Sequence, residues 1–374
     1  MVYLDYSATT PVDRRVLESF ERTSLEYIGN ANALHLEGIK SKKLMEAATH
    51  QVASLLNVND KEIIFTSGAS ESNNLAIFGV INKYPNRGKT IITTKLEHSS
   101  IQEPMKIIEK KGYHIEYVKM DEKGKVDLDD LKRLINQDTI LVSICEVNSE
   151  IGIIQNVHEI GDILKKYPKI LFHVDGTQAV GKKKINLDNI DLYSFSGHKI
   201  YGLKGIGCLV KKENIELEPI IYGGKSQTIY RAGTPPLPLI VSLAKALKLI
   251  MNEEESNYRY VLELRERLLN GLKKINGVMI NSNEDCLPHI VNISVMGVKP
   301  ETMLHWLEED EIYISTKTAC SKNSDLSESV YALTKDEIKA KSSLRISLSH
   351  LTKSSEIDFF LEKLEEKVNQ LDKI

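Results

Sequence analysis

Short apolar runs recur through the first two-thirds of the chain and alternate with stretches of helical spacing. Most of the runs are continuously apolar, which is typical of strands buried on both faces of a sheet. Helical spacing lies between several of them, for example at 72–80 and 157–167. The pattern therefore predicts crossover connections and a mostly parallel sheet with helices on both faces. The predicted strands are Glu62–Thr66, Thr90–Thr94, His114–Lys119, Ile140–Glu146, Ile170–Asp175, Leu192–Ser196 and Ile206–Val210.

The pattern changes near the proline-rich stretch 235–238. A long helical stretch follows, roughly from Ile240 to Ile275. Alternating segments (HIVNISV, IYIST and SLRISL) and a terminal helix from about Ser355 come after it. We interpret this part as a smaller α+β domain joined to a larger α/β domain. We place the large domain at 15–236 and the small domain at 1–14 and 237–374.

Composition narrows the class of protein without identifying it. The chain has 374 residues, with 41% hydrophobic and 27% charged residues, which is typical of a globular protein. A net charge of −3 gives no electrostatic reason to expect nucleic acid as a partner, and short basic runs such as 182–184 are common on solvated surfaces. No secretory signal and no apolar run of about 20 residues is evident, so we expect a cytoplasmic protein with no membrane association. Four dispersed cysteines favour a reducing compartment and argue against a zinc site or a disulfide framework.

Polar residues gather where three of the predicted strands end. In open α/β sheets, ligands bind beyond the carboxyl ends of the strands. The first cluster, TSGASE at 66–71, follows a strand and precedes a helical stretch. Its small residues let backbone N–H groups approach an anion, and a helix N-terminus adds unpaired donors and a favourable dipole. A phosphate site is one interpretation of this cluster, and an ordinary serine N-cap is the other.

The second and third clusters are HVDGTQ at 173–178 and SFSGHK at 194–199. Asp175, at the end of a buried strand, needs a cationic or hydrogen-bonding partner, and a structural salt bridge or a protonated pyridine nitrogen would provide one. Lys199 lies between His198 and an apolar strand, where desolvation favours the free amine that a Schiff base requires. A lysine is more often only a surface charge, and Lys204 is a nearby rival. Together, an anion site, a buried carboxylate and an amine are what pyridoxal 5'-phosphate (PLP) needs.

A nucleotide-binding protein is a weaker alternative. The chain has no Walker A pattern and no GxGxxG motif. The glycine-rich stretch GLKGIG at 202–207 precedes a predicted strand, which is the wrong context for a dinucleotide fingerprint.

The sequence resembles the cysteine desulfurase family of NifS/IscS type, among the class V, fold type I PLP enzymes. The resemblance covers almost the whole chain and rests on ordered motifs: YLDYSATTP, FTSGASESNNLAI, LEHSSI, VNSEIGIIQ, HVDGTQAVGK, SFSGHKIYGLKGIG, RAGTP, TACS and SLRISLSHLT. It implies a large PLP-binding domain with a mostly parallel, seven-stranded-type sheet. It also implies a homodimer.

The resemblance assigns a role to each candidate residue. Lys199 would bind the cofactor covalently, Asp175 would pair with the pyridinium nitrogen, and His98 would stack on the ring and help in proton transfer. The remaining cofactor-binding positions would be Ala69, Ser70, Gln178, Ser196, His198 and Thr234, the last reaching in from the second subunit. Substrate would be held by Asn148 and Arg345, with Arg345 taking the carboxylate. From the residues alone, His98 could merely cap a helix and Arg345 could face solvent, although the alternation in SLRISL sets Arg345 apart from its apolar neighbours.

Cys320 differs from the other cysteines in its surroundings. Cys145 and Cys208 lie in apolar strands, where a buried cysteine acts as a small hydrophobe, and Cys286 lies in a polar stretch. Cys320 is surrounded by Ser, Thr, Lys, Asn and Asp, so we expect an exposed thiol on a mobile loop. The expected reaction removes sulfur from L-cysteine, leaves a persulfide on Cys320, and releases L-alanine.

Departures from the family pattern leave the sulfur acceptor open. Lys317 and Thr318 stand before Ala319-Cys320, and Glu328 is followed directly by Ser329. An iron–sulfur scaffold or a tRNA-thiolation enzyme would be the protein partner. The alternatives to cysteine desulfuration are a selenocysteine lyase, a cysteine-sulfinate desulfinase, another class V aminotransferase, or a non-catalytic sulfur-delivery scaffold that kept the fold.

Overall fold

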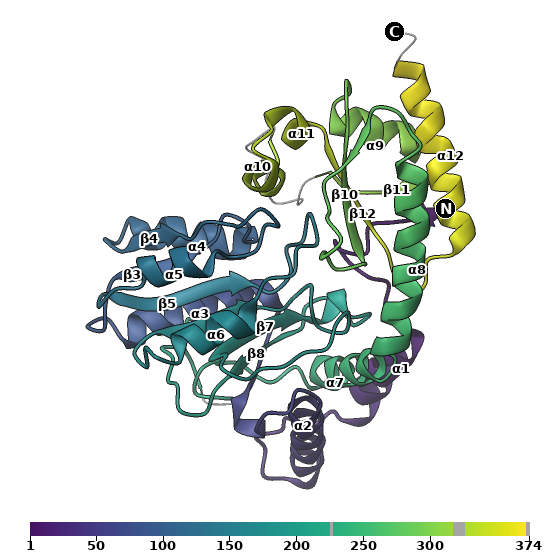
Figure 1. The fold of residues 1–374 in the computed structure, drawn as a ribbon. Coiled ribbons are helices and arrows are strands. Elements are labelled where there is room, and N and C mark those ends of the chain that lie inside the picture. Colours follow the sequence, from purple (N-terminus) through teal and green to yellow (C-terminus); the bar gives the residue numbers. More distant parts are fainter. Residues whose placement is uncertain (225–226, 317–325, 372–374) are drawn as a thin grey trace.

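A seven-stranded sheet forms the centre of the computed structural model, which describes residues 1–224, 227–316 and 326–371 (Figure 1). The strand order is β2-β8-β7-β6-β5-β3-β4. All neighbours are parallel except β8, which runs antiparallel to both β2 and β7. The mostly parallel sheet predicted from the sequence is confirmed. Its strands are β2 (Ile63–Thr66), β3 (Thr90–Thr93), β4 (His114–Tyr117), β5 (Thr139–Cys145), β6 (Leu171–Asp175), β7 (Leu192–Ser196) and β8 (Gly207–Lys211).

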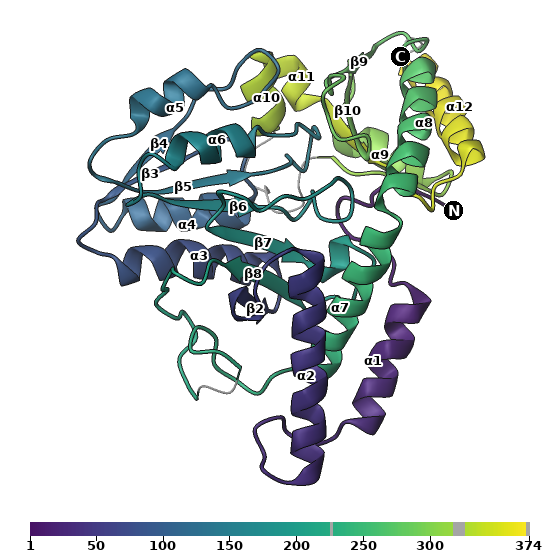
Figure 2. The same cartoon turned by 60° about the horizontal axis from the view of Figure 1, so that its bottom comes forward.

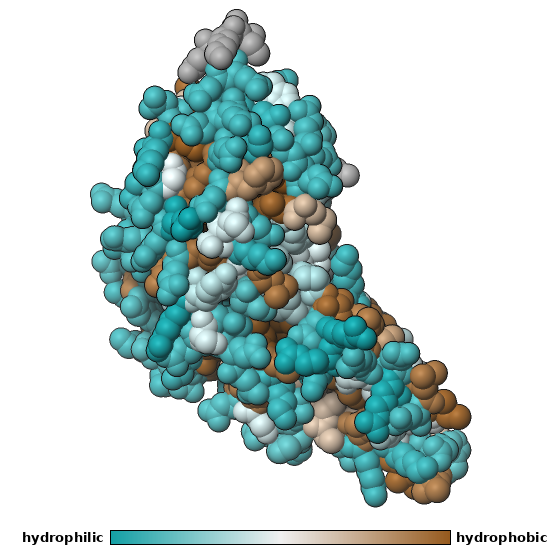
Figure 3. Space-filling view, turned by 90° about the vertical axis from the view of Figure 1, so that its right-hand side faces the viewer, coloured by the Kyte–Doolittle hydropathy of each residue, from teal (hydrophilic) through white to brown (hydrophobic). Residues whose placement is uncertain are grey.

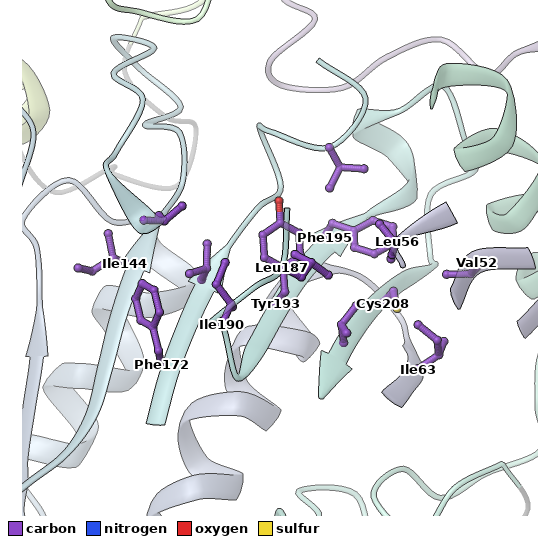
Figure 4. Packing of buried hydrophobic residues seen from close by; sticks show 14 of the residues in the cluster. Val52, Leu56, Ile63, Ile144, Phe172, Leu187, Ile190, Tyr193, Phe195 and Cys208 are labelled. Atoms are coloured by element: carbon purple, nitrogen blue, oxygen red, sulfur yellow. The ribbon is translucent and has the colours of Figure 1, made fainter. Parts of the chain in front are cut away.

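Helices cover both faces of this sheet because successive side chains of each strand point to opposite faces. In β2, Ile63 and Phe65 join one hydrophobic cluster, whereas Ile64 joins another. Figure 4 shows the first cluster in close-up, and Figure 2 shows helices above and below the sheet. The first cluster packs against α2 (Leu36–Leu55), α5 (Leu128–Leu134), α6 (Val157–Leu164) and α7 (Leu237–Asn252), and the second against α3 (Ala69–Lys83) and α4 (Ser99–Glu109).

Local sequence explains where several of these helices begin and which face they bury. In α6, the buried residues Val157, Ile160, Gly161 and Leu164 recur at spacings of three and four, so one stripe faces the sheet. The preceding Asp127 caps α5 by accepting hydrogen bonds from the first-turn N–H groups. Asp13 does the same for α1 (Arg14–Glu26).

A second, antiparallel sheet lies in the C-terminal third, with strand order β12-β10-β9. Its strands are β9 (Val278–Ile280), β10 (Ile290–Val295) and β12 (Ser343–Ser347). One face packs on α8 (Glu254–Leu272), α9 (Pro300–Glu308) and α12 (Ser354–Leu371). A short parallel pair, β1 (Val2–Tyr3) with β11 (Ile312–Tyr313), brings the start of the chain to this region. Two short helices, α10 (Glu328–Thr334) and α11 (Glu337–Lys341), complete it.

The long helical stretch expected at 240–275 is interrupted at Glu253. Helix α7 ends before this residue and α8 begins after it. The two helices bury their apolar faces in different clusters, since α7 packs with the large sheet and α8 with the C-terminal sheet. One straight helix could not pack against both clusters.

The division into two domains stays a prediction, and its support is the separation of these clusters. Val2 and Leu4 pack in the C-terminal cluster, as a small domain that includes 1–14 requires. Because α7 packs with the large sheet, we propose that the junction lies at Glu253 rather than near 236. Among the helices in the described ranges, none combines the length and the apolar composition needed to cross a bilayer.

His173 on β6 is fully buried inside the sheet region. Its Nδ1 lies 2.9 Å from the Ser143 hydroxyl on β5, and its Nε2 lies 3.0 Å from the Ser194 hydroxyl on β7. Burial lowers the pKa of His173 from 6.5 to about 4, although the Asp175 carboxylate opposes this shift. The imidazole is therefore neutral in the folded protein at neutral pH. In this uncharged form it makes hydrogen bonds with both hydroxyls.

We expect the free energy of unfolding to fall as the pH is lowered from about 6.5 towards 4. In this window the unfolded chain protonates His173 and the folded chain does not, which costs up to about 1.4 kcal/mol per pH unit. His173→Gln keeps a polar side chain but removes the titration, so its stability should depend less on pH. Urea unfolding at several pH values measures this, with the exposed His158→Gln as control. Equal pH slopes for the wild type and His173→Gln would contradict the expectation.

Candidate active site at the strand ends

A cavity of about 580 Å³ lies at the carboxyl ends of the central strands. Its wall combines the ends of β5, β6 and β7, the first turn of α3, the N-terminal segment 7–9 and one residue of β12. Most of the residues selected from the sequence meet here, although they come from distant parts of the chain. Those that line the cavity are Ala69, Ser70, His98, Asp175, Gln178, Ser196, His198, Lys199 and Arg345.

The first turn of α3 offers unpaired backbone donors to the cavity. Because the helix begins at Ala69, the N–H groups of its first turn have no acceptor within the helix, and the helix dipole favours an anion there. The strand β8 approaches this turn so closely that a Cβ on Gly207 would lie 2.6 Å from the Cα of Gly68. Ser196 and His198, just after β7, line the same cavity. These features fit a phosphate group.

Glu71, in the same helical turn, is a carboxylate that would repel an anion if it were unpaired. It accepts a hydrogen bond from the Ser67 N–H at 2.8 Å and another from Arg231 Nε at 3.0 Å. Burial alone raises the pKa of Glu71, but the hydrogen bonds from Ser67 and Arg231 lower it overall. The Arg231 guanidinium therefore offsets this charge next to the first turn of α3. The sequence alone does not reveal this pair, because Glu71 and Arg231 are 160 positions apart.

Lys199 lies in a short 3-10 turn directly after β7. Its Nζ donates to the carbonyl of Ser7 at 2.5 Å and to that of Ala8 at 2.7 Å. The same N-terminal segment is held by Thr10, which donates from its backbone N–H and its hydroxyl to the carbonyl of His198. The amine is thus positioned inside the cavity by two carbonyls. The rival Lys204 also lines the cavity but is exposed.

Asp175 is buried at the end of β6 and is held by hydrogen bonds instead of an ion pair. Oδ1 accepts from the Thr177 N–H at 3.0 Å, and Oδ2 accepts from Asn73 Nδ2 at 2.8 Å. Within the described residues it forms no salt bridge with Lys or Arg, so the structural salt bridge considered from sequence is not observed. The carboxylate keeps lone pairs for a further donor from the cavity.

His98 both caps a helix and lines the cavity. As the N-cap of α4, its Nδ1 accepts from the Ser100 N–H at 3.2 Å and lies 2.9 Å from the Ser100 hydroxyl. Burial lowers the pKa of His98; the Asp175 carboxylate opposes this, and the Lys199 ammonium adds to it. Its ring is therefore neutral at neutral pH.

Gln178 and Lys182 form a hydrogen-bonded chain that reaches the N-terminal segment at the cavity. Gln178 Nε2 donates to the Ser7 carbonyl at 2.9 Å, and Lys182 Nζ donates to Gln178 Oε1 at 2.7 Å. Burial lowers the pKa of Lys182 to about 7, and the positive charges of Lys199 and Arg345 act in the same direction. Lys182 was interpreted from sequence as part of a solvated basic run, and the structure shows that it is buried.

Arg345 confirms the alternation seen in SLRISL. Leu344 and Ile346 are in the C-terminal hydrophobic cluster, whereas Arg345 lines the cavity. Its Nη2 donates to Asp5 Oδ1 at 2.8 Å and its Nη1 donates to the Ser149 carbonyl at 3.0 Å. The buried Nε has no hydrogen-bond acceptor among the described residues. The guanidinium is fixed in place and keeps donors for an anionic group.

Of the selected residues that the structure describes, Asn148 and Thr234 do not line this cavity. Asn148 holds the turn after β5, because its Oδ1 accepts from the backbone N–H groups of residues 150 and 151 and its Nδ2 donates to the Leu96 carbonyl. Thr234 is exposed. Cys320 lies outside the described residues. Cys145, expected to be only a small hydrophobe in a strand, is buried and also lines the cavity, and burial raises the pKa of its thiol.

Comparison with known proteins places the chain in a family. The model of a family described as aminotransferase class-V matches residues 2–360. A relative named cysteine desulfurase IscS from Vibrio campbellii is 39% identical and aligns with 99% of this chain and 93% of its own length. Another of the same name from Buchnera aphidicola is 41% identical, with the same coverage.

Solved structures agree with these sequence matches. A NifS-like protein has a TM-score of 0.93 at 36% identity, covering 98% of this chain and 99% of the other. A NifS-like protein from Rickettsia africae has a TM-score of 0.88 at 32% identity, covering 99% of both chains. A third, titled SspA in complex with cysteine, has a TM-score of 0.82 at 32% identity, covering 93% of this chain and 99% of the other. The chain belongs to the class-V aminotransferase family, in its NifS/IscS cysteine desulfurase group.

Proposed function

We propose that this protein is a PLP-dependent cysteine desulfurase. It removes sulfur from L-cysteine, releases L-alanine and leaves a persulfide on Cys320, which then passes to an acceptor protein such as an iron–sulfur scaffold or a tRNA-thiolation enzyme. The observation that carries the proposal is the single cavity that unites the N-terminus of α3, Asp175, Lys199 and Arg345. The names of the relatives and of the cysteine-bound neighbour point to the same substrate.

The residues of the cavity fit PLP. The first turn of α3, with Ala69 and Ser70, and the facing Ser196 and His198 suit the phosphate. Asp175 suits a protonated ring nitrogen, and Gln178 suits a ring hydroxyl. Buried Thr177 Oγ1 and Arg345 Nε, both from residues of the cavity wall, have no hydrogen-bond partner among the described residues, as expected of groups that await a ligand. When bound, PLP supplies an aldehyde for an amine and a ring that withdraws electrons from the α-carbon.

Arg345 orients the substrate in this proposal. Its planar guanidinium matches the geometry of a carboxylate, and its hydrogen bonds to Asp5 and Ser149 hold it in one orientation. The substrate carboxylate binds to the donors that these partners leave free. Lys199 takes up and returns the α-proton at Nζ, and neutral His98 assists at its ring.

The described segment that precedes Cys320 lies beside the cavity. Ser315 and Arg345 exchange backbone hydrogen bonds at 3.1 and 2.7 Å, so the segment that leads to Cys320 starts beside a cavity residue. Five residues of extended chain span at most about 17 Å. The thiolate of Cys320 attacks the sulfur of the bound substrate, forming the S–S bond as the Cβ–S bond breaks.

We further propose a homodimer in which Thr234 serves the partner's cavity. Large hydrophobic side chains are exposed at the end of α1 and the start of α2, namely Leu25, Ile28, Leu34 and Leu36. Leu34 is 94% exposed and Ile28 81% exposed in the single chain, which is unusual for residues of this size. Figure 3 shows hydrophobic residues gathered at the lower tip of the molecule, the end at which α2 lies in Figure 1. A cytoplasmic location stays a prediction.

Replacing Lys199 should remove both the covalent attachment of PLP and the activity. We expect Lys199→Ala to lose the visible absorbance band of the bound cofactor, and alanine release from L-cysteine to fall at least about 100-fold. The matched variant Lys204→Ala should keep the band, because its amine is exposed. A lost band in Lys204→Ala and a retained band in Lys199→Ala would reverse the assignment.

Replacing Cys320 should separate cofactor binding from sulfur transfer. We expect Cys320→Ala to keep the absorbance band but to release sulfide and alanine from L-cysteine at least about 100-fold more slowly in the presence of a reductant. Cys286→Ala is the control, because burial raises the pKa of Cys286 to about 11 and the residue does not line the cavity. Undiminished desulfuration by Cys320→Ala, or none by the wild type, would refute the proposed persulfide route. Selenocysteine lyase activity that survives without Cys320 would favour that alternative.

The exposed apolar residues provide a test of the dimer. A carboxylate at Leu34 would be buried without a partner in the interface, so Leu34→Asp should weaken association at least about tenfold. Light scattering coupled to size exclusion measures the mass of the wild type and of the variant. The control is Ile338→Asp, a similar change at an exposed position of α11. A wild-type monomer that carries PLP and is active would rule out the proposed role of Thr234.

A further inference from the structure

Asn73 and Ser100 connect Asp175 to His98 through hydrogen bonds that the proposed function does not use. Asn73, on α3, is fully buried, and its Nδ2 lies 2.8 Å from Asp175 Oδ2 and 2.9 Å from Ser100 Oγ. The Ser100 hydroxyl in turn lies 2.9 Å from His98 Nδ1. Three cavity residues, Asp175, Ser100 and His98, are thus joined through one buried amide.

The direction of each hydrogen bond follows from the chemistry of the groups. An ionised carboxylate only accepts, so the atom of Asn73 that faces Asp175 is the amide nitrogen. The second hydrogen of the same nitrogen goes to Ser100 Oγ. Ser100 Oγ accepts from Asn73 and keeps a second lone pair and its own hydrogen, so the direction of its bond to His98 Nδ1 is set by the state of that nitrogen.

A second donor reaches the same atom of His98. The backbone N–H of Ser100 lies 3.2 Å from Nδ1, in the helix-capping geometry of α4. This N–H can only donate, so Nδ1 accepts from it, and the Ser100 hydroxyl then donates to Nδ1 as well. Nδ1 must be the unprotonated, accepting nitrogen of the ring.

We propose that Asn73 and Ser100 are positioning residues that fix neutral His98 in the tautomer with its proton on Nε2. Asn73 is oriented by Asp175, Ser100 is oriented by Asn73, and His98 is oriented by Ser100. The carboxylate proposed to pair with the cofactor ring thereby also determines which nitrogen of His98 carries the proton available in the cavity. The hydrogen-bond assignment stands on the structure alone, whereas its catalytic value rests on the proposed function.

The electrostatic surroundings of His98 favour the neutral ring that this arrangement requires. The charged groups near it are Asp175, Lys199, Glu150 and Arg345, two of each sign. Burial is the largest influence and lowers the pKa of His98. Protonation would add a hydrogen at Nδ1, where two donors already point, so the network and the burial act in the same direction.

Nitrogen NMR of histidine-labelled protein tests the tautomer directly, with and without PLP, at pH 7.5. The His98 signals are assigned by their loss in His98→Asn. The wild type should show an unprotonated Nδ1 and a protonated Nε2. In Ser100→Ala one of the two donors is lost, so the ratio of the tautomers should fall about fivefold and the two signals should approach each other. Ser99→Ala, in the same helical turn, is the matched control and should leave the His98 signals unchanged.

Kinetics with L-cysteine tests the catalytic value. Ser100→Ala should lower kcat roughly fivefold with little change in KM, because substrate binding does not involve the hydroxyl. Ser100→Thr restores the hydroxyl and should restore both kcat and the spectrum. Asn73→Leu, which removes the donor to Ser100, should change the His98 signals in the same direction as Ser100→Ala.

Three results would contradict the inference. A proton on Nδ1 in the wild type, or signals unaffected in both Ser100→Ala and Asn73→Leu, would refute the assigned tautomer. A changed tautomer with an unchanged kcat would refute its catalytic value. If the wild type releases no alanine from L-cysteine, the proposed function fails while the spectra still decide the tautomer.

Discussion

The segment from Leu4 to Thr10 lies between the two sheets, and both sides of the cavity depend on the hydrogen bonds that it makes. On one side, the Leu4 carbonyl accepts from the backbone of Ser347, and Asp5 binds Arg345. On the other side, the carbonyls of residues 7 and 8 accept from Lys199, and Thr10 is bonded to the turn after β7. The cationic groups at the two sides of the cavity therefore have fixed positions relative to each other. A cofactor and a substrate can be bound together only if that separation is maintained.

The charged side chains around the cavity are likewise held by partners. Glu71 is offset by Arg231, and Asp5 by Arg345, so neither carboxylate opposes an incoming anion. Lys182 is buried next to Gln178, where its positive charge is less stable than in water. The cavity thus presents donors and positive charge to an anionic ligand, while each nearby carboxylate is held by a donor.

The strands, their mostly parallel orientation and the polar residues at their carboxyl ends could be predicted from the sequence, because these features depend on local patterns. Short strand-like runs, most of them continuously apolar, identified every strand of the large sheet, and the rule that ligands bind at carboxyl ends selected Asp175 and Lys199. Asn73 could not be found in this way, since a polar residue in a helix normally faces solvent and only the fold brings it next to Asp175. The break at Glu253 was missed because no proline or glycine marks it and leucines recur in both helices. Lys182 was misjudged because a run of three lysines does not reveal which one points inward.

The ion pair of Asp5 with Arg345 joins residues 340 positions apart in the chain. During synthesis from the N-terminus, Asp5 is made 340 residues before its partner. The large sheet and most of its helices can form in that interval, because their strands are complete by Lys211. Completion of the cavity must wait for β12, so the nascent chain can bind its ligand only after this strand has been made. A ribosome-bound intermediate would have a formed sheet and an amine at position 199, but no guanidinium opposite it.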